Sequence, residues 1–234
     1  MPKLPLEGVR VLDITVVWAG PYCTSFLADL GAEVIRIESL NTFVPLGRGP
    51  MAHPTEEDLK GMSPWAGATP GRVPGARPWN RYPIFNAHAR NKLGMTLDFF
   101  RPGGMDIFKR LVKISDVFVE NNPTSTMENL GISYPLLQEQ NPGIIMLRMP
   151  AYGNTGAYRN HRAYGLHIEG VIGHTLQRGY ADMDPSANST VLMSDAAGGT
   201  DGGGAAADVG VRRAPHPRRQ RGDRHPLVEL RPLA

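Results

Sequence analysis

The chain has 234 residues, a net charge of +3 at neutral pH and a single cysteine, and 41% of its residues are hydrophobic. One cysteine excludes an internal disulfide, and no long apolar run indicates a secretory leader or a membrane span. We therefore expect a cytoplasmic protein with no membrane partner, and with one substantial core or two small ones.

The first 38 residues predict a strand, a helix and a second strand. Residues 9–15 are apolar and rich in β-branched side chains, as in a parallel strand that is covered on both faces. Gly20 and Pro21 end this strand, and the apolar positions 23, 26, 27 and 30 predict a helix that is capped by Gly31. Charged and apolar residues alternate through residues 33–38, which predicts a strand nearer the sheet edge.

Short motifs stand at regular places in this stretch. A Leu-x-Gly begins at Leu6, Ala-Gly-Pro occupies residues 19–21, and a Leu-Gly-Ala-x-Val-Ile run begins at Leu30 and leads to Glu38. The pattern resembles the N-terminus of the family III CoA-transferases, the CaiB/BaiF family, which includes formyl-CoA transferase, carnitine CoA-transferase and the α-methylacyl-CoA racemases. The resemblance implies an α/β fold with the Rossmann-like parallel sheet of the family's large domain, here incomplete, and an interlocked dimer.

A dinucleotide-binding unit is the competing interpretation of the same stretch. Such a unit needs Gly-x-Gly-x-x-Gly at the first turn, so that a pyrophosphate can approach the backbone. This chain offers Gly20 alone at that turn, and the dinucleotide interpretation is therefore set aside.

The middle of the chain predicts the rest of an α/β domain. Residues 42–81 are rich in Pro, Gly and polar residues, which predicts a long surface loop. Further strands are expected over residues 95–99, 116–120 and 144–149, and helices over residues 103–114 and 134–140. The family's Asn-Lys-x-x-x-x-Leu-Asp pattern is matched at Asn91, Lys92, Leu97 and Asp98.

The expected ligand site lies beyond the carboxyl ends of the strands, where open parallel sheets bind their ligands. Trp18 and Asn121 follow two different strands and should meet there. The resemblance implies that CoA is bound by Val17, Trp18, Ala19, Lys92, Leu97, Asn121 and Asn122. Formyl-CoA transferase and its near relatives carry arginines where this chain has Ser39 and Asn129, so Lys92 or Arg48 would have to compensate. A solvated lysine at a strand entrance is the alternative for Lys92.

The candidate catalytic residue is Asp195. An apolar strand is expected over residues 190–193, followed by Asp195 and then by Gly198 and Gly199. The resemblance implies that this carboxylate attacks an acyl-CoA thioester and forms a mixed anhydride. The neighbouring small residues would admit the substrate, and their N–H groups would stabilise the oxyanion. The alternative is that Asp195 is a helix N-cap or turn residue.

A second cluster lies on a helix expected from residue 164 to 173. Racemase relatives carry a His-Asp pair where this chain has Tyr164 and Gly165, which counts against racemisation. His167 would replace that histidine only by facing the same cleft, and a lone helical histidine is more often a surface or capping residue. We expect Glu169 to be a solvated helix charge and the Tyr164 hydroxyl to lie near the acyl group.

The C-terminal residues differ in composition from the rest. Residues 205–234 carry seven arginines against three acidic residues, and the chain after Gly202 shows neither helical nor strand periodicity. We expect residues 1–202 to be the N-terminal part of the large domain and residues 203–234 to be a disordered tail, produced by a frameshift. This basic tail lacks lysine and interleaved aromatic residues, so a nucleic-acid partner is not expected.

Together these features predict an enzyme that moves CoA from an acyl-CoA to a carboxylic acid through an aspartyl-acyl anhydride. It would use coenzyme A as a thioester substrate, need no metal, and form a homodimer as its relatives do. The alternatives are an acyl-CoA racemase, a catalytically silent fragment or a subunit that needs a separate C-terminal partner, and a basic-tailed nucleic-acid-binding protein.

Overall fold

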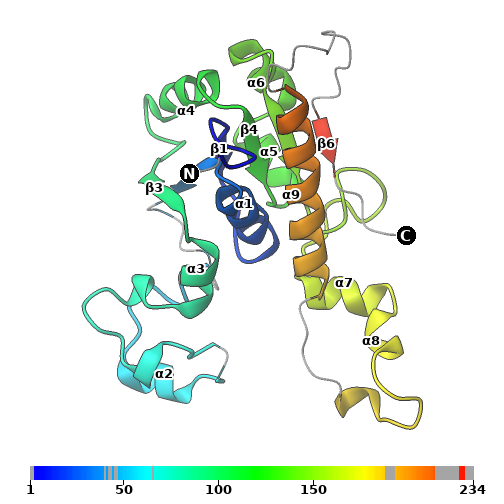
Figure 1. Ribbon diagram of the computed structural model, residues 1–234. Coiled ribbons are helices and arrows are strands. Elements are labelled where there is room, and N and C mark those ends of the chain that lie inside the picture. The colour runs from blue at the N-terminus through cyan, green and yellow to red at the C-terminus, as the bar shows by residue number, and fades with distance from the viewer. Residues whose placement is uncertain are drawn as a thin grey trace.

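A parallel sheet forms the centre of the molecule in the computed structural model, which describes residues 3–39, 41, 44, 47–64, 66–187, 193–213 and 227–229 (Figure 1). Its strand order is β3-β2-β1-β4-β5-β6, and every pairing between neighbours is parallel. The strands are β1 (Arg10–Asp13), β2 (Glu33–Glu38), β3 (Lys92–Thr96), β4 (Val117–Glu120), β5 (Ile145–Arg148) and β6 (Leu227–Glu229). The predicted Rossmann-like parallel sheet is therefore confirmed.

Helices cover both faces of this sheet. They are α1 (Ala19–Asp29), α2 (Glu56–Gly61), α3 (Pro83–His88), α4 (Gly104–Lys113), α5 (Thr124–Asn129), α6 (Tyr134–Gln140), α7 (Gly165–Val171), α8 (His174–Gln177) and α9 (Met193–Arg213). Short 3₁₀ turns span Pro70–Arg72, Pro78–Asn80 and Pro185–Ala187. None of the helices in the described part of the chain is both long and apolar enough to cross a membrane.

Alternation along the strands divides the core in two. Val11 points into a cluster with α1 and α9, whereas its neighbour Leu12 points into a cluster with α4, α5 and α6. β4 alternates in the same way, with Val117 and Val119 on the first face and Phe118 on the second. A strand buried on both faces reads as a continuous apolar run, which is why these strands could be recognised in the sequence.

Helix α1 begins two residues before Pro21 and ends in the predicted glycine cap. Gly31 has φ +102° and its N–H donates to the carbonyl of Ala28, while the N–H of Ala32 donates to the carbonyl of Leu27. This is the Schellman arrangement, which satisfies the last carbonyls of the helix. Cys23 is fully buried on α1, and burial raises the pKa of its thiol to about 12, as expected of an inert packing residue.

Two predictions for the middle of the chain need correction. Strand β3 spans residues 92–96 rather than 95–99, because it pairs with residues 34–38 of β2. The predicted surface loop contains helix α2, whose Thr55 and Asp58 form a reciprocal capping box at its start. Leu59 of this helix is fully buried. The capping box was a usable signal that the Pro and Gly content of this segment concealed.

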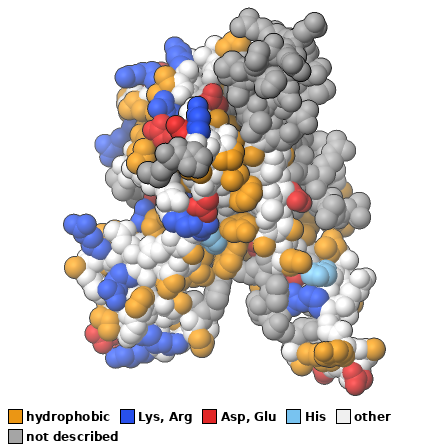
Figure 2. Space-filling model, in the orientation of Figure 1, with side chains coloured by type: hydrophobic (Ala, Val, Ile, Leu, Met, Phe, Trp, Pro, Cys, Tyr) orange, Lys and Arg blue, Asp and Glu red, His pale blue; other side chains and the backbone are white. Residues whose placement is uncertain are grey.

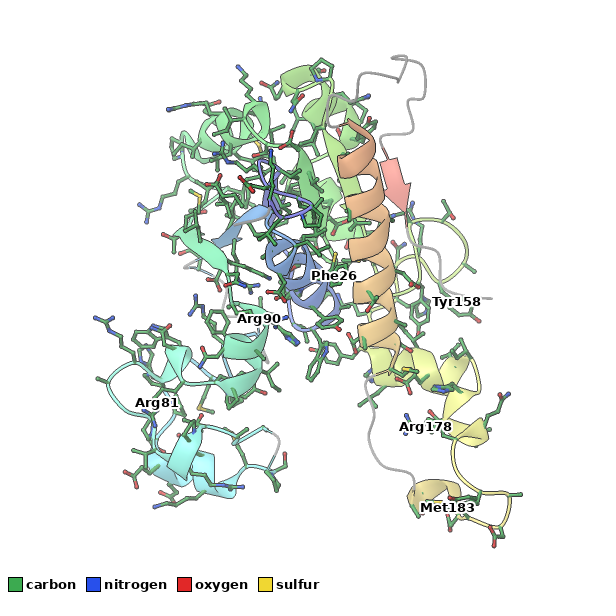
Figure 3. All side chains as sticks on the ribbon, viewed as in Figure 1. Phe26, Arg81, Arg90, Tyr158, Arg178 and Met183 are labelled. Carbon is green, nitrogen blue, oxygen red and sulfur yellow. The ribbon has the colours of Figure 1, made fainter. Side chains whose placement is uncertain are left out.

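Helix α9 corrects the predicted end of regular structure. It continues to Arg213 and lies alongside α1, so the prediction that residues 203–234 are disordered is wrong for residues 203–213. It is also wrong for residues 227–229, which form β6 beside β5. A Cβ at Gly203 would lie 2.8 Å from Cδ1 of Phe26, which is on the side of α1 that faces α9 (Figure 3). Glycines therefore allow close packing here, and their helical period carries no hydrophobic signal. The frameshift stays a prediction, and residues 214–226 and 230–234 lie outside the described residues.

Candidate active site

Two asparagines after β4 hold the loop that follows β1. Asn121 accepts a hydrogen bond from the N–H of Val16 (2.7 Å) and donates one to its carbonyl (2.9 Å). The Asn122 side chain donates to the carbonyl of Ile14 (3.2 Å). The structure thus brings Asn121 to the loop that contains Val17 and Trp18, and both amides position backbone there. Val17 has φ +63°, an uncommon conformation for a β-branched residue, so this turn is strained.

Aromatic side chains support the same turn. Trp18 directly precedes α1 and packs edge-to-face on His88, with ring centroids 4.9 Å apart, and Tyr22 also packs edge-to-face on His88 at 5.9 Å. His88 is 8% exposed, and its Nδ1 has no hydrogen-bond partner among the described residues. Burial, together with nearby Lys92 and Arg90, lowers the pKa of His88 to about 4. His88 could not be recognised from the sequence, because a single histidine on a short helix carries no signal.

Asp195 lies in the first turn of α9 and meets the first residues of two other helices. Its Oδ2 accepts a hydrogen bond from the N–H of Gly165 at 3.1 Å, and its carboxylate also accepts one from the N–H of Ala19. Gly165 begins α7 and Ala19 begins α1. Unsatisfied N–H groups at helix starts favour an anion, which explains why a carboxylate is tolerated here.

The electrostatic surroundings of Asp195 nevertheless favour its protonated form. Burial raises the pKa of the Asp195 carboxyl, the hydrogen bonds from Gly165 and Ala19 oppose this rise, and the nearby charge of Glu169 adds to it. The net effect is a pKa above the ordinary value, and no cation is among the groups that shift it. A partly desolvated carboxylate of this kind is more basic and more nucleophilic than one in an ion pair.

Glycines permit the close approach of these helices. A Cβ at Gly165 would lie only 2.2 Å from Oδ2 of Asp195, and a Cβ at Gly199 would lie 2.7 Å from the carbonyl oxygen of Ala19. A Cβ at Gly198 would meet no atom within 4 Å. Since Gly198 and Gly199 lie beyond the first turn of α9, their N–H groups bond within the helix and are not free to stabilise an oxyanion, contrary to the expectation from sequence.

The expected strand before Asp195 is not seen at its one described position. Met193 is the first residue of α9, and residues 190–192 lie outside the described residues. The alternative of a helix N-cap or turn residue is close but not correct, because Asp195 is the third residue of α9 and its carboxylate bonds to another helix. It does not conflict with a chemical role, because a helix start can also hold a reactive anion.

Glu169 is buried and paired, so its prediction as a solvated helix charge is wrong. It is 1% exposed; its Oε2 lies 2.9 Å from Nη1 of Arg178 and 3.2 Å from Nδ1 of His174. Its Oε1 accepts a hydrogen bond from the N–H of Ser194 at 3.1 Å. The residue lies within the site, next to Asp195.

The other side chains of this cluster point to solvent. His167 is exposed and its Nδ1 accepts a hydrogen bond from the N–H of Tyr164 at 3.1 Å, which confirms the interpretation as a surface and capping residue. The Tyr164 side chain is 45% exposed. This geometry gives no support to His167 as the missing racemase histidine.

Lys92 is directed to a buried ion pair away from Asp195. Its Nζ lies 3.1 Å from Oδ2 of Asp13 and donates to the carbonyl of Pro21 (2.8 Å) and to Oγ1 of Thr24 (2.6 Å). Its side chain is 1% exposed, so the alternative of a solvated lysine is wrong. All three ammonium protons are used inside the fold, and a direct contact of Lys92 with CoA gains no support. Leu97, just after β3, is a core residue on the side of the sheet that α4 covers.

Arg48 likewise has protein partners. Its guanidinium pairs with Glu38 (Nε to Oε1, 2.8 Å) and lies 3.8 Å from the centroid of the Phe85 ring. These residues line a cavity of about 260 Å³ together with Arg36, Asn86, Ala89, Arg90, Lys92, Leu93 and Gly94. A second cavity, of about 280 Å³, lies between α5, α6 and β5. Asp195 lines neither cavity, and no cluster of three or more potential metal ligands occurs in the part of the chain that the structure describes.

The fold and the site together define an α/β domain in which the Asp195 carboxylate, without a cation among the groups that shift its pKa, lies beside the loop after β1 at the carboxyl edge of a parallel sheet. Comparison with known proteins names the class more closely. The model of CoA-transferase family III matches residues 6–214, and the chain belongs to that family.

Curated relatives agree with this assignment. The chain is 34% identical over 193 residues to the succinyl-CoA–L-malate CoA-transferase alpha subunit of Chloroflexus aurantiacus, covering 82% of this chain and 40% of that protein. It is 32% identical to succinyl-CoA:glutarate CoA-transferase of Mus musculus, covering 83% of this chain and 39% of that one. The chain thus spans about two fifths of the length of these relatives.

Solved structures share the fold. A CaiB/BaiF family protein from Brucella suis aligns with a TM-score of 0.69 and 27% identity, over 90% of this chain and 51% of that one. The protein Rv3272 from M. tuberculosis aligns with a TM-score of 0.66 and 26% identity, over 91% of this chain and 58% of that one.

Proposed function

We propose that this chain is the N-terminal, nucleophile-bearing part of a CoA-transferase, with Asp195 as the nucleophile. The observation that carries the proposal is the environment of the Asp195 carboxylate. It is held by the N–H groups of Ala19 and Gly165, it has no cation among the groups that shift its pKa, and its pKa is raised. Family membership supplies the thioester substrate.

The proposed chemistry uses the carboxylate as a temporary acyl carrier. An Asp195 oxygen attacks the thioester carbonyl, the C–S bond breaks, and CoA leaves as a thiolate, which gives a mixed anhydride. The thiolate then attacks the aspartyl carbonyl and releases the first acid, leaving an aspartyl-CoA thioester. The acceptor carboxylate attacks this thioester, and the returning thiolate takes the new acyl group, which regenerates free Asp195.

The residues around Asp195 would position it for this attack. The two N–H groups fix the direction of the carboxylate without neutralising its charge, so little reorganisation is needed before attack. The strained turn at Val17 and Trp18 lies directly before Ala19, where the resemblance places CoA. We infer that the thioester end of CoA approaches Asp195 across this turn.

The acceptor we propose is a short dicarboxylic acid. The names of several relatives contain malate, oxalate or glutarate as one of the exchanged acids. In all three cases the second carboxylate distinguishes the acceptor from a simple fatty acid. A panel of mono- and dicarboxylic acids, with succinyl-CoA as donor, tests this point directly.

The experiment that tests the nucleophile is hydroxylamine trapping after incubation with an acyl-CoA. Hydroxylamine should convert the Asp195 anhydride or thioester into a hydroxamate that is visible in the mass of its peptide. Asp195→Asn should abolish trapping and lower the transfer rate at least a thousandfold. The matched control is Asp201→Asn on the exposed side of the same helix, which should leave both unchanged. An unmodified Asp195 in a protein that transfers CoA contradicts the proposal.

One observation favours the alternative that the chain is silent without further polypeptide. Large apolar side chains on and after α7 and α8 are exposed, among them Val171 (67%), Leu176 (73%) and Tyr180 (83%) (Figure 2). A surface of this kind is usually covered by protein. If transfer appears only when a C-terminal segment from a relative is co-expressed, this chain acts as one part of a larger assembly, such as the family's interlocked dimer.

A further inference from the structure

Two residues of α7 hold the first turn of α9. Gly165 and Glu169 are four positions apart, so they lie on the same face of α7, one turn from each other. The Gly165 N–H donates to Asp195, and the Glu169 carboxylate accepts from the N–H of Ser194. Two neighbouring residues of α9 are therefore fixed by two neighbouring turns of α7.

The same carboxylate also ties down the segment that follows α7. Oε2 of Glu169 accepts a hydrogen bond from Arg178, which lies close to α7 (Figure 3). The same oxygen is also close to Nδ1 of His174 in α8. One side chain thus connects α7, α8 and the start of α9. Charged side chains are rarely buried to this degree unless every lone pair is used, and here both oxygens have partners.

Apolar packing holds α9 mainly further along the helix. Gly203 and Ala206 pack against α1 and the sheet, and Ala206 is 1% exposed. At the other end, Met193 is 53% exposed and Ser194 and Asp195 are half-buried. The position of the first turn therefore depends strongly on polar contacts, of which those to Gly165 and Glu169 are the ones made by α7.

We propose that Glu169 is a positioning residue for Asp195. It anchors the N-terminal turn of α9 through Ser194 and so fixes the position of the Asp195 carboxylate between α1 and α7. It does not touch the substrate in this role. The consequence for catalysis rests on the proposed function, whereas the anchoring itself does not.

Glu169 also contributes a negative charge near Asp195. The groups that face Asp195 are the N–H donors of α1 and α7 and the Glu169 carboxylate, with Arg178 and His174 on the far side of Glu169. Removing the negative charge should lower the pKa of Asp195. The acid limb of the rate profile would then move to lower pH, a readout that a purely structural role would not move.

Two variants separate the anchor from the charge. Glu169→Gln keeps an oxygen for the Ser194 N–H and removes the charge, whereas Glu169→Ala removes both. We expect Glu169→Ala to lower kcat roughly 100-fold with KM for acyl-CoA changed less than about threefold, since small displacements of a reacting group cost about that much. Glu169→Gln should recover most of this loss and shift the acid limb downward.

The control and an activity-independent measurement complete the test. Phe108→Leu, in the core on the opposite face of the sheet, provides a variant of reduced stability with Asp195 untouched. A ¹³C carboxyl titration, assigned with Asp195→Asn, reports the Asp195 pKa in each variant, and hydrogen exchange reports protection of the Ser194 amide.

Three outcomes are possible. A deprotected Ser194 amide in Glu169→Ala supports the anchoring, and a lower Asp195 pKa in Glu169→Gln supports the effect of the charge, even if no variant forms an acyl-enzyme, in which case the proposed function fails by itself. An unchanged pKa and unchanged amide protection overturn the inference. A loss of kcat no larger than in Phe108→Leu also overturns it.

Discussion

The pKa values of two carboxylates in this domain are shifted in opposite directions. Asp13, at the end of β1, is fully buried and accepts hydrogen bonds from both hydroxyls of Thr15 and Thr24, with Nζ of Lys92 at 3.1 Å and Nη1 of Arg36 at 3.9 Å. Burial by itself would raise the pKa of Asp13, but Lys92, Arg36 and the two threonines outweigh it and hold the pKa below its ordinary value.

Asp195 is less buried, yet its burial raises its pKa, because only two backbone N–H groups oppose that effect and the charge of Glu169 adds to it. The comparison shows that charged and hydrogen-bonding partners can outweigh burial in setting the pKa of a carboxylate. Asp13 is neutralised and structural. Asp195 is only partly stabilised, which supports its proposed role as the nucleophile.

Neutralising Asp13 should have the largest effect on the free energy of unfolding. Asp13→Asn leaves Lys92 and Arg36 buried beside a neutral amide, and uncompensated buried charge costs about 3–5 kcal/mol. Urea denaturation should show a loss of this size. The double variant Asp13→Asn with Lys92→Met removes the stranded ammonium and should recover part of the loss; no recovery would mean that the charge pair is not the cause.

Placing a methyl group against the Asp195 carboxylate should have the next largest effect on the free energy of unfolding. A Cβ at position 165 would lie 2.2 Å from Oδ2 of Asp195, so Gly165→Ala must push the carboxylate away from α7. We expect a loss of about 1–3 kcal/mol in unfolding free energy and of roughly 100-fold in kcat. Gly170→Ala, on the same helix with no atom within 4 Å, is the control and should be neutral or stabilising. Equal effects of the two variants would contradict the close contact.

Removing the charge of Asp195 should have a smaller and opposite effect on stability. A carboxyl whose folded-state pKa lies above its unfolded value of about 3.9 loses stability as the pH rises through that interval. Ionised Asp195 therefore destabilises the fold at pH 7, and Asp195→Asn should raise Tm there while abolishing transfer. The gain should vanish below about pH 4, and a lower Tm at pH 7 would show that Asp195 is stabilising after all.

The smallest expected effect on stability comes from His88, whose neutral imidazole packs against Trp18. The folded-state pKa of His88 is about 4, well below the ordinary value of about 6.5, so the unfolded chain takes up the proton first. This contributes a loss of stability as the pH falls from about 6.5 towards about 4. Thermal melts of His88→Gln should decline less steeply over that range than those of the parent. The exposed His53→Gln is the control and should follow the parent.

Much of the sheet was predictable, because strands buried on both faces appear as apolar runs. The loop after β1 and its meeting with Asn121 followed from the rule for parallel sheets. Asp195 was singled out by its motif, and its catalytic role stays a proposal. Glu169 and Gly165 were not recognised, because a charged helical residue gives no sign of its burial and a single glycine gives no sign of what approaches it. Lys92 was assigned to a ligand for a related reason: its partner Asp13 is 79 positions away.

The glycine-rich start of α9 was the other main difficulty. Its small residues suggested a loop for substrate approach, whereas they pack a helix against α1. Helical periodicity is visible only where large apolar and polar residues alternate, and here close packing of small residues replaces that pattern.

The most direct test of Asp195 as the nucleophile measures the transfer of oxygen atoms to its carboxylate, and not the reaction rate. During transfer from succinyl-CoA to an acceptor acid labelled with ¹⁸O in its carboxylate, each cycle through the anhydride leaves one acceptor oxygen on the nucleophile. After turnover and digestion, the peptide that contains Asp195 should carry ¹⁸O, and the peptide that contains Asp13 should not. Label at another carboxylate, or turnover without label at Asp195, would contradict the assignment of Asp195 as the reacting group.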